Sequence, residues 1–116
     1  NQIKNVINEY YSAISEQNMS KALGCCVNNS DAYADTSQLK SFLYTLYGTC
    51  DSITLNFFAN INNVSISGDN AQVHLHVYGE ISACVLNNSK EEDIVCTLKK
   101  VGSVWKLFSG DYLLSN

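Results

Sequence analysis

Two histidines, His74 and His76, stand two positions apart in the second half of the chain. Residues two apart in a β-strand point to the same face, so both imidazoles are placed to bind one metal ion. Glu80 shares their parity and is the nearest candidate for a third ligand. The opposite parity is apolar and is expected to cover helices, which leaves the histidines on the outer face of a sheet. The sequence therefore predicts a solvent-facing or dimer-facing pair rather than a metal site.

Five cysteines, at 25, 26, 50, 84 and 96, leave at least one thiol unpaired within the chain. With no Cys-x-x-Cys pair and no zinc-finger spacing to the histidines, a structural zinc site is not predicted. Cys84 and Cys96 lie at equal distances from residue 90, inside a turn expected at 87–90, and would face each other in a symmetric hairpin. This favours a Cys84–Cys96 disulfide; a bridge from Cys50 to Cys25 or Cys26, or buried free thiols, are the alternatives.

Length and charge restrict the classes of function. The 116 residues suit one domain, 1–116, and the net charge is −4 with lysine as the basic residue throughout. No basic patch is present, so nucleic acid is not an expected partner. No apolar run reaches the roughly 18 residues of a transmembrane helix. The chain begins at Asn1 rather than Met, as it would after removal of an export signal or anchor, or after trimming.

The first half of the chain has helical periodicity. Ile3, Ile7, Tyr10 and Ile14 recur at three- and four-residue steps and predict a first amphipathic helix. Asn18 is placed to cap a short second helix over 19–26. A third helix is predicted over 35–47, with Asp35 as its N-cap and Gly48 at its end. Its apolar stripe is formed by Leu39, Phe42, Leu43, Leu46 and Tyr47.

After Asp51 the period changes to the alternation of β-strands. The first strand runs through 53–66 with a bulge near Asn62-Asn63, and a turn follows at 68–70. A long strand then carries one apolar face, followed by a strand over 92–100, a tight turn at Gly102-Ser103 and a last strand over 104–114. The apolar face of the long strand comprises Val73, Leu75, Val77, Ile81, Ala83 and Val85. This order predicts an α+β domain in which N-terminal helices pack in a curved antiparallel sheet of four or more strands.

Two segments carry a resemblance to a known group of proteins. Asn18-Met19-Ser20-Lys21-Ala22-Leu23 follows the first helix, and Gly102-Ser103-Val104-Trp105-Lys106-Leu107 begins the last strand. Both resemble segments of the nuclear transport factor 2-like superfamily, and within it the chain is similar to domains of exported bacterial proteins and lipoproteins. The resemblance implies a cystatin-like cone, in which a curved sheet wraps the first helix and leaves a pocket at the open end.

The resemblance also implies where a ligand would bind. Ketosteroid-isomerase-like relatives place a tyrosine of the first helix in the cone, which makes Tyr10 and Tyr11 candidates for an oxyanion-binding hydroxyl. Such enzymes also need a carboxylate base, and the inward positions offer almost none. Asp111 has the parity of Trp105 and would be the acid that turns inward. The candidate pocket residues are Tyr10, Tyr11, Tyr47, Phe57, Trp105 and Asp111.

Two hypotheses of function remain open at this point. The first is a non-enzymatic domain of an exported or surface protein that binds a small apolar ligand or a partner chain, as a homodimer through the sheet in one version. The second is a cofactor-independent lyase or isomerase with its site in the cone. Neither requires a cofactor. Disulfides would favour an extracytoplasmic location over the cytoplasm.

Overall fold

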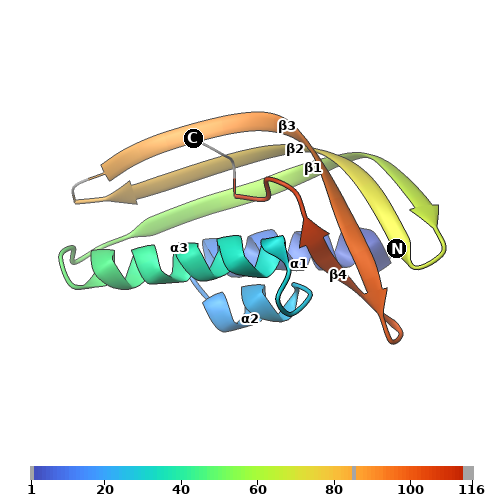
Figure 1. The fold of residues 1–116 in the computed structure, drawn as a ribbon. Helices are drawn as coiled ribbons and strands as arrows, with labels where there is room; N and C mark the ends of the chain where they lie inside the picture. The colour runs from blue at the N-terminus through green and yellow to red at the C-terminus, as the bar shows by residue number, and fades with distance from the viewer. Residues whose placement is uncertain (1, 85, 114–116) are drawn as a thin grey trace.

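The computed structural model describes residues 2–84 and 86–113, and its helices precede its strands as the change of period predicts (Figure 1). The strands form an antiparallel sheet in the order β1-β2-β3-β4. The predicted α+β class is confirmed. The elements are α1 (Gln2–Ser15), α2 (Met19–Gly24), α3 (Asp31–Tyr47), β1 (Thr54–Ser67), β2 (Asn70–Ala83), β3 (Leu86–Val101) and β4 (Val104–Ser109).

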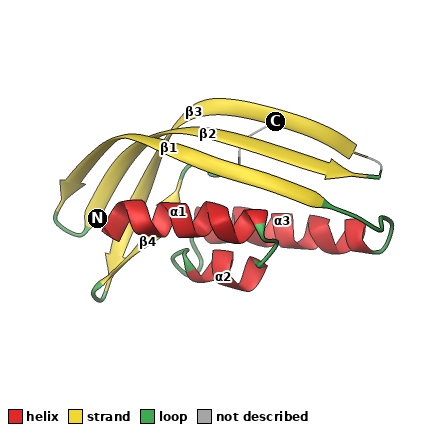
Figure 2. Ribbon diagram, turned by 180° about the vertical axis from the view of Figure 1, so that it is seen from behind, coloured by secondary structure: helices red, strands yellow, loops and turns green. Residues whose placement is uncertain are grey.

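The sheet curves over α1, and the last part of β3 bends down with β4 beside that helix (Figure 2). The apolar stripe of α1 is buried on the concave side, with Ile7 and Tyr10 fully inaccessible to solvent. Val73, Leu75 and Val77 of β2 face the same core, as their parity predicts. No helix in the described part of the chain is long and apolar enough to cross a membrane.

The ends of the helices follow from capping residues, with one correction. Asn18 caps α2 as predicted, since its side chain accepts a hydrogen bond from the Lys21 N–H. Gly48 ends α3 as predicted. However, α3 begins one turn earlier than expected, because the Ser30 hydroxyl accepts from the Tyr33 N–H and is its N-cap. Asp35 therefore lies within the helix and caps nothing.

The predicted bulge and two of the predicted turns are present in the sheet. The register of β1 with β2 shifts between Ile61 and Asn63, which is the predicted bulge. The turns at Gly68 and Gly102 also lie where expected, and both glycines have positive φ. The last strand ends at Ser109 and not at residue 114, because the chain turns at Gly110, whose φ is +134°. Residue 114, like Val85, lies outside the described residues.

The hairpin between β2 and β3 corrects the disulfide prediction. Ala83 pairs with Leu86, so the two strands are joined before residue 86 and the residues 87–90 belong to β3. Cys96 then pairs with Val73, far from Cys84. Cys84 is bonded to Cys50 instead, across an S–S distance of 2.09 Å, and Cys25, Cys26 and Cys96 are free and buried. This bridge ties the end of α3 to the tip of the sheet, which lie together at the left of Figure 1.

Loss of this bridge is expected to lower the free energy of unfolding. Cys50 and Cys84 are 34 residues apart, and a loop of this size gives about 3–4 kcal/mol in the chain-entropy model. The variant Cys84→Ser, compared with wild type by urea unfolding, should show most of this loss. Reductant should lower the stability of wild type and leave the variant unchanged. Equal stability of oxidised and reduced wild type would contradict this role.

Candidate functional site

The interior of the cone is filled by three tyrosines. Tyr10, Tyr11 and Tyr112 are each at most 2% exposed. The ring centroids of Tyr10 lie 5.2 Å from Tyr11 and 5.8 Å from Tyr112, both in edge-to-face geometry. Their hydroxyls are engaged within the protein: Tyr10 with the Thr36 hydroxyl at 2.7 Å and Tyr11 with the Tyr112 carbonyl at 2.8 Å. These phenols therefore act as packing groups with satisfied hydrogen bonds.

Tyr112 reaches the interior because the chain changes direction at Gly110. A Cβ atom at Gly110 would lie 2.5 Å from the Cys96 Cβ and 2.9 Å from its Cα, and φ of +134° is disfavoured for other residues. The turn carries Asp111 outward and Tyr112 inward. The Tyr112 hydroxyl then donates to the Thr97 carbonyl at 2.8 Å, so the residue is held both at its hydroxyl and at its backbone carbonyl.

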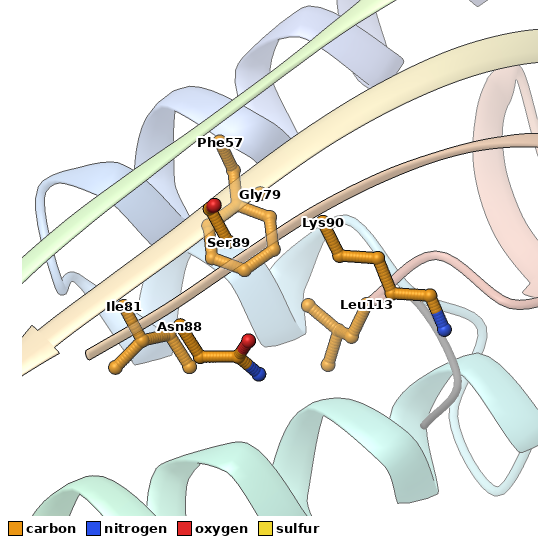
Figure 3. A pocket seen from close by; sticks show the side chains of 7 residues that line it. All are labelled: Phe57, Gly79, Ile81, Asn88, Ser89, Lys90 and Leu113. Atoms are coloured by element: carbon orange, nitrogen blue, oxygen red, sulfur yellow. The ribbon is translucent and has the colours of Figure 1, made fainter. Parts of the chain in front are cut away.

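A pocket remains at the open end of the cone, between the concave side of the sheet and the segment that follows β4 (Figure 3). We call it the mouth pocket. It encloses about 70 Å³, and its walls combine apolar side chains with polar groups of β3. It is lined by Phe57, Gly79, Ile81, Asn88, Ser89, Lys90 and Leu113.

One carboxylate on the concave side was missed by the sequence analysis. Glu92 lies opposite the fully buried Val77, one inward position beyond Lys90, and is partly buried. Its Oε1 atom is buried and has no hydrogen-bond partner among the described residues. Glu92 continues the alternation of Ile94, Cys96 and Leu98, so the sequence pattern of β3 would have predicted that its side chain points inward.

The structure separates the residues that were predicted to form a ligand pocket. Phe57 lines the mouth pocket. Tyr47 is 45% exposed and donates a hydrogen bond to Gln17 Oε1 at 2.8 Å. Trp105 lies near the other end of the domain, in a groove of about 260 Å³ between α1 and β4. Asp111 is exposed, because the strand that would have turned it inward ends at Ser109.

Titratable groups near the core give little support for nucleophilic chemistry. Burial raises the pKa of the Cys25 and Cys96 thiols to about 11, so both are protonated at neutral pH. Partial desolvation, followed by repulsion from Asp31 and Asp111, raises the pKa of Asp35. Asp35 lies in the first turns of α3 and does not line the mouth pocket.

The two histidines lie on the outer face of the sheet, as predicted. His76 is held between two carboxylates of β3: its Nδ1 is 2.7 Å from Asp93 Oδ1 and its Nε2 is 3.0 Å from Glu91 Oε1. The hydrogen bonds that the imidazole donates to Asp93 and, second, to Glu91 raise the pKa of His76. Within the described residues, no group of three His, Cys, Asp or Glu side chains could hold a metal ion.

Known structures share this architecture at low sequence identity. A scytalone dehydratase-like protein from Novosphingobium aromaticivorans matches with a TM-score of 0.73 and 16% identity, over 94% of this chain and 78% of that one. The beta subunit of benzoate 1,2-dioxygenase from Burkholderia mallei matches at 0.71 and 14%, over 97% and 92%. A ketosteroid isomerase-like protein from Erwinia carotovora atroseptica matches at 0.68 and 11%, over 94% and 90%.

The chain has the nuclear transport factor 2-like cone fold. No protein-family model and no curated protein matches the sequence. At these identities the likeness establishes the fold alone, and the activities of the neighbours do not transfer with it. In this chain, the segment that follows β4 places Tyr112 inside the cone.

The His76 ion pairs predict a pH-dependent contribution to stability. Because the pKa of His76 is raised in the folded state, its ion pairs contribute fully to stability below the unfolded-state pKa of 6.5. This contribution is lost as pH rises through the folded-state pKa. The difference in unfolding free energy between wild type and His76→Gln should therefore shrink as pH rises from about 6.5 through the raised folded-state pKa. In a background carrying Glu91→Gln and Asp93→Asn, which removes both carboxylate partners, the difference should lose this trend. A difference that is constant with pH would contradict the assignment.

The tyrosine cluster predicts a graded loss of stability at residue 112. Tyr112→Phe removes the hydrogen bond to the Thr97 carbonyl and is expected to cost about 1 kcal/mol. Tyr112→Ala also leaves a cavity and should cost about 3–5 kcal/mol. Tyr44→Phe is the control, because Tyr44 is 63% exposed. Chemical unfolding measures all three, and a Tyr112→Ala variant as stable as the control would rule out a packing role for Tyr112.

Proposed function

We propose that this domain is a non-enzymatic binding module that receives an apolar side chain of a partner protein in its mouth pocket. The observation that carries the proposal is the pocket itself, which combines Phe57, Ile81 and Leu113 with polar groups at its rim. Ligand sites that enclose a whole small molecule measure about 300–1,000 Å³. A pocket of about 70 Å³ suits a single side chain better.

The contents of the cone favour binding over the alternative of a lyase or isomerase. Such an enzyme needs at least two polar side chains that converge on a substrate, one of them a titratable acid or base. The hydroxyls of Tyr10, Tyr11 and Tyr112 are used in internal hydrogen bonds. Glu92 is the carboxylate closest to such a role, and none of these hydroxyls is bonded to it. The proposal therefore assigns Glu92 to recognition.

The disulfide supports an extracytoplasmic location for the module. Bridges of this kind persist in oxidising compartments and are rare in the cytosol. Cys50 and Cys84 join α3 to the sheet tip near the mouth, where Ile81 lines the pocket. An oxidising environment would therefore keep the walls of the mouth in place. This agrees with the resemblance to domains of exported proteins.

An apolar side-chain analogue is expected to bind in the mouth pocket. N-acetyl-leucine amide should shift the NMR signals of Phe57, Ile81 and Leu113 in a saturable way, with a dissociation constant in the millimolar range expected at about −0.3 kcal/mol per heavy atom. N-acetyl-glycine amide should not. Ile81→Trp should fill the pocket and abolish the effect, whereas Ile66→Trp, at a strand end that is 56% exposed, should retain it. Shifts spread evenly over the surface would count against the proposal.

A further inference from the structure

Most of the outer edge of β3 has no neighbouring strand. β3 is 16 residues long, and β2 follows it from Leu86 to Lys99, but β4 pairs with it over 97–101 alone. Along Leu86–Cys96, which we call the free edge, no other strand of the described chain is paired on that side. Unpaired backbone N–H and C=O groups of such an edge are a template for another strand. Lys90 has a contact of its own within the chain, so pairing is expected to use its neighbours.

The opposite edge of the sheet is covered at its start by side chains of the described chain. At β1 the Ser15 hydroxyl accepts from the Phe57 N–H at 2.8 Å and donates to the Phe57 carbonyl at 3.0 Å. The Gln17 side-chain amide donates to the Ile53 carbonyl at 2.8 Å. The last residue of α1 and a residue just after it thus occupy the start of the β1 edge, as natural proteins commonly arrange. At the free edge of β3, Gly110 packs against Cys96 and Leu113 lies beside Asn88 and Ser89, but, Lys90 aside, no side chain of the described residues is hydrogen-bonded to its backbone.

The mouth pocket lies directly beside the free edge. Asn88, Ser89 and Lys90 of β3 contribute to its lining, together with Leu113 from the segment beyond β4 (Figure 3). A strand added to this edge would place alternate side chains on the concave side, because side chains alternate along a strand. One inward side chain of the added strand would then be positioned to enter the pocket.

Glu92 supplies a second recognition group at the right spacing. It is the next inward position after Lys90, and its buried Oε1 atom lacks a hydrogen-bond partner among the described residues. A buried carboxylate oxygen without a donor carries a desolvation cost that a cationic partner would relieve. Because inward positions are two residues apart, the apolar side chain and the cation would be separated by one residue in the added strand.

We propose that the free edge of β3 is a strand-addition site for an extended basic segment of a partner protein. An apolar side chain of that segment enters the mouth pocket, and a Lys or Arg two positions away contacts Glu92. The inference rests on the proposed function and specifies its partner. The charge of the edge supports a basic partner, since the three acidic groups Glu91, Glu92 and Asp93 outnumber Lys90 and the His76 that pairs with two of them.

A second copy of this chain fits the edge less well. Antiparallel pairing about the middle of the free edge would bring the two Glu91 side chains directly opposite each other. Like charges in that position destabilise a pair of strands. Edge-to-edge dimerisation is therefore an outcome that the experiment must detect rather than the expected one.

The test uses oxidised wild-type protein and synthetic ten-residue peptides of alternating Thr and Val with a central Lys-Thr-Leu. Fluorescence anisotropy should show binding that weakens at least about tenfold when Glu replaces the Lys, or when Gly replaces the Leu. Glu92→Gln should weaken binding of the Lys peptide by a similar factor. Glu80→Gln, the same substitution on the outer face of β2, should not. Hydrogen exchange should show new protection at the amides of the free edge.

The outcomes separate the two proposals. Peptide binding without added protection on β3, or without any effect of Glu92→Gln in a variant whose unfolding curve matches wild type, would overturn strand addition. If N-acetyl-leucine amide still binds the mouth pocket, the proposed function survives that result; if neither probe binds, both proposals fail. Dimerisation of the chain that the Lys peptide does not disrupt, seen by light scattering, would overturn the choice of partner.

Discussion

The hydrogen bond from the Tyr11 hydroxyl to the Tyr112 carbonyl joins the first helix to the last described turn across 101 positions of sequence. Both groups are buried, and an unpaired buried donor or acceptor costs about 1–3 kcal/mol, so each holds the other in place. Tyr112 is also fixed through its hydroxyl to Thr97 in β3. The arrangement makes the inside of the cone part of the hydrophobic core and leaves the mouth pocket at its open end.

The parts of the fold that the sequence predicts are those that periodic burial determines locally. The stripes of α1 and the parity of β2 have one face that must leave water, and the structure buries those faces. The hairpin after β2 was predicted wrongly for a physical reason. Residues 87–90 have turn-like composition, yet the edge they form is exposed, so a strand tolerates them there. Misplacing this turn misassigned the partner of Cys84.

The site was less predictable because it depends on contacts distant in sequence. Asp111 was predicted to point inward from the alternation of the last strand. That alternation applies only within a strand, and β4 ends before Gly110, which packs against Cys96. Phe57 was identified because its strand is regular. The inward position of Glu92 could have been predicted from the alternation of its own strand in the same way. Its buried oxygen is informative because the rest of the described interior satisfies its polar groups.

These features together are the basis of the proposed function. Because tyrosine side chains fill the inside of the cone, the proposal places recognition at groups that packing leaves unused. Those groups lie on one side of the mouth: the outer-edge backbone of β3 away from Lys90, the wall formed by Ile81 and Leu113, and the Glu92 carboxylate. Because the Cys50–Cys84 bridge fixes α3 to the tip of the same sheet, an incoming strand would meet an organised edge and would lose less entropy on binding.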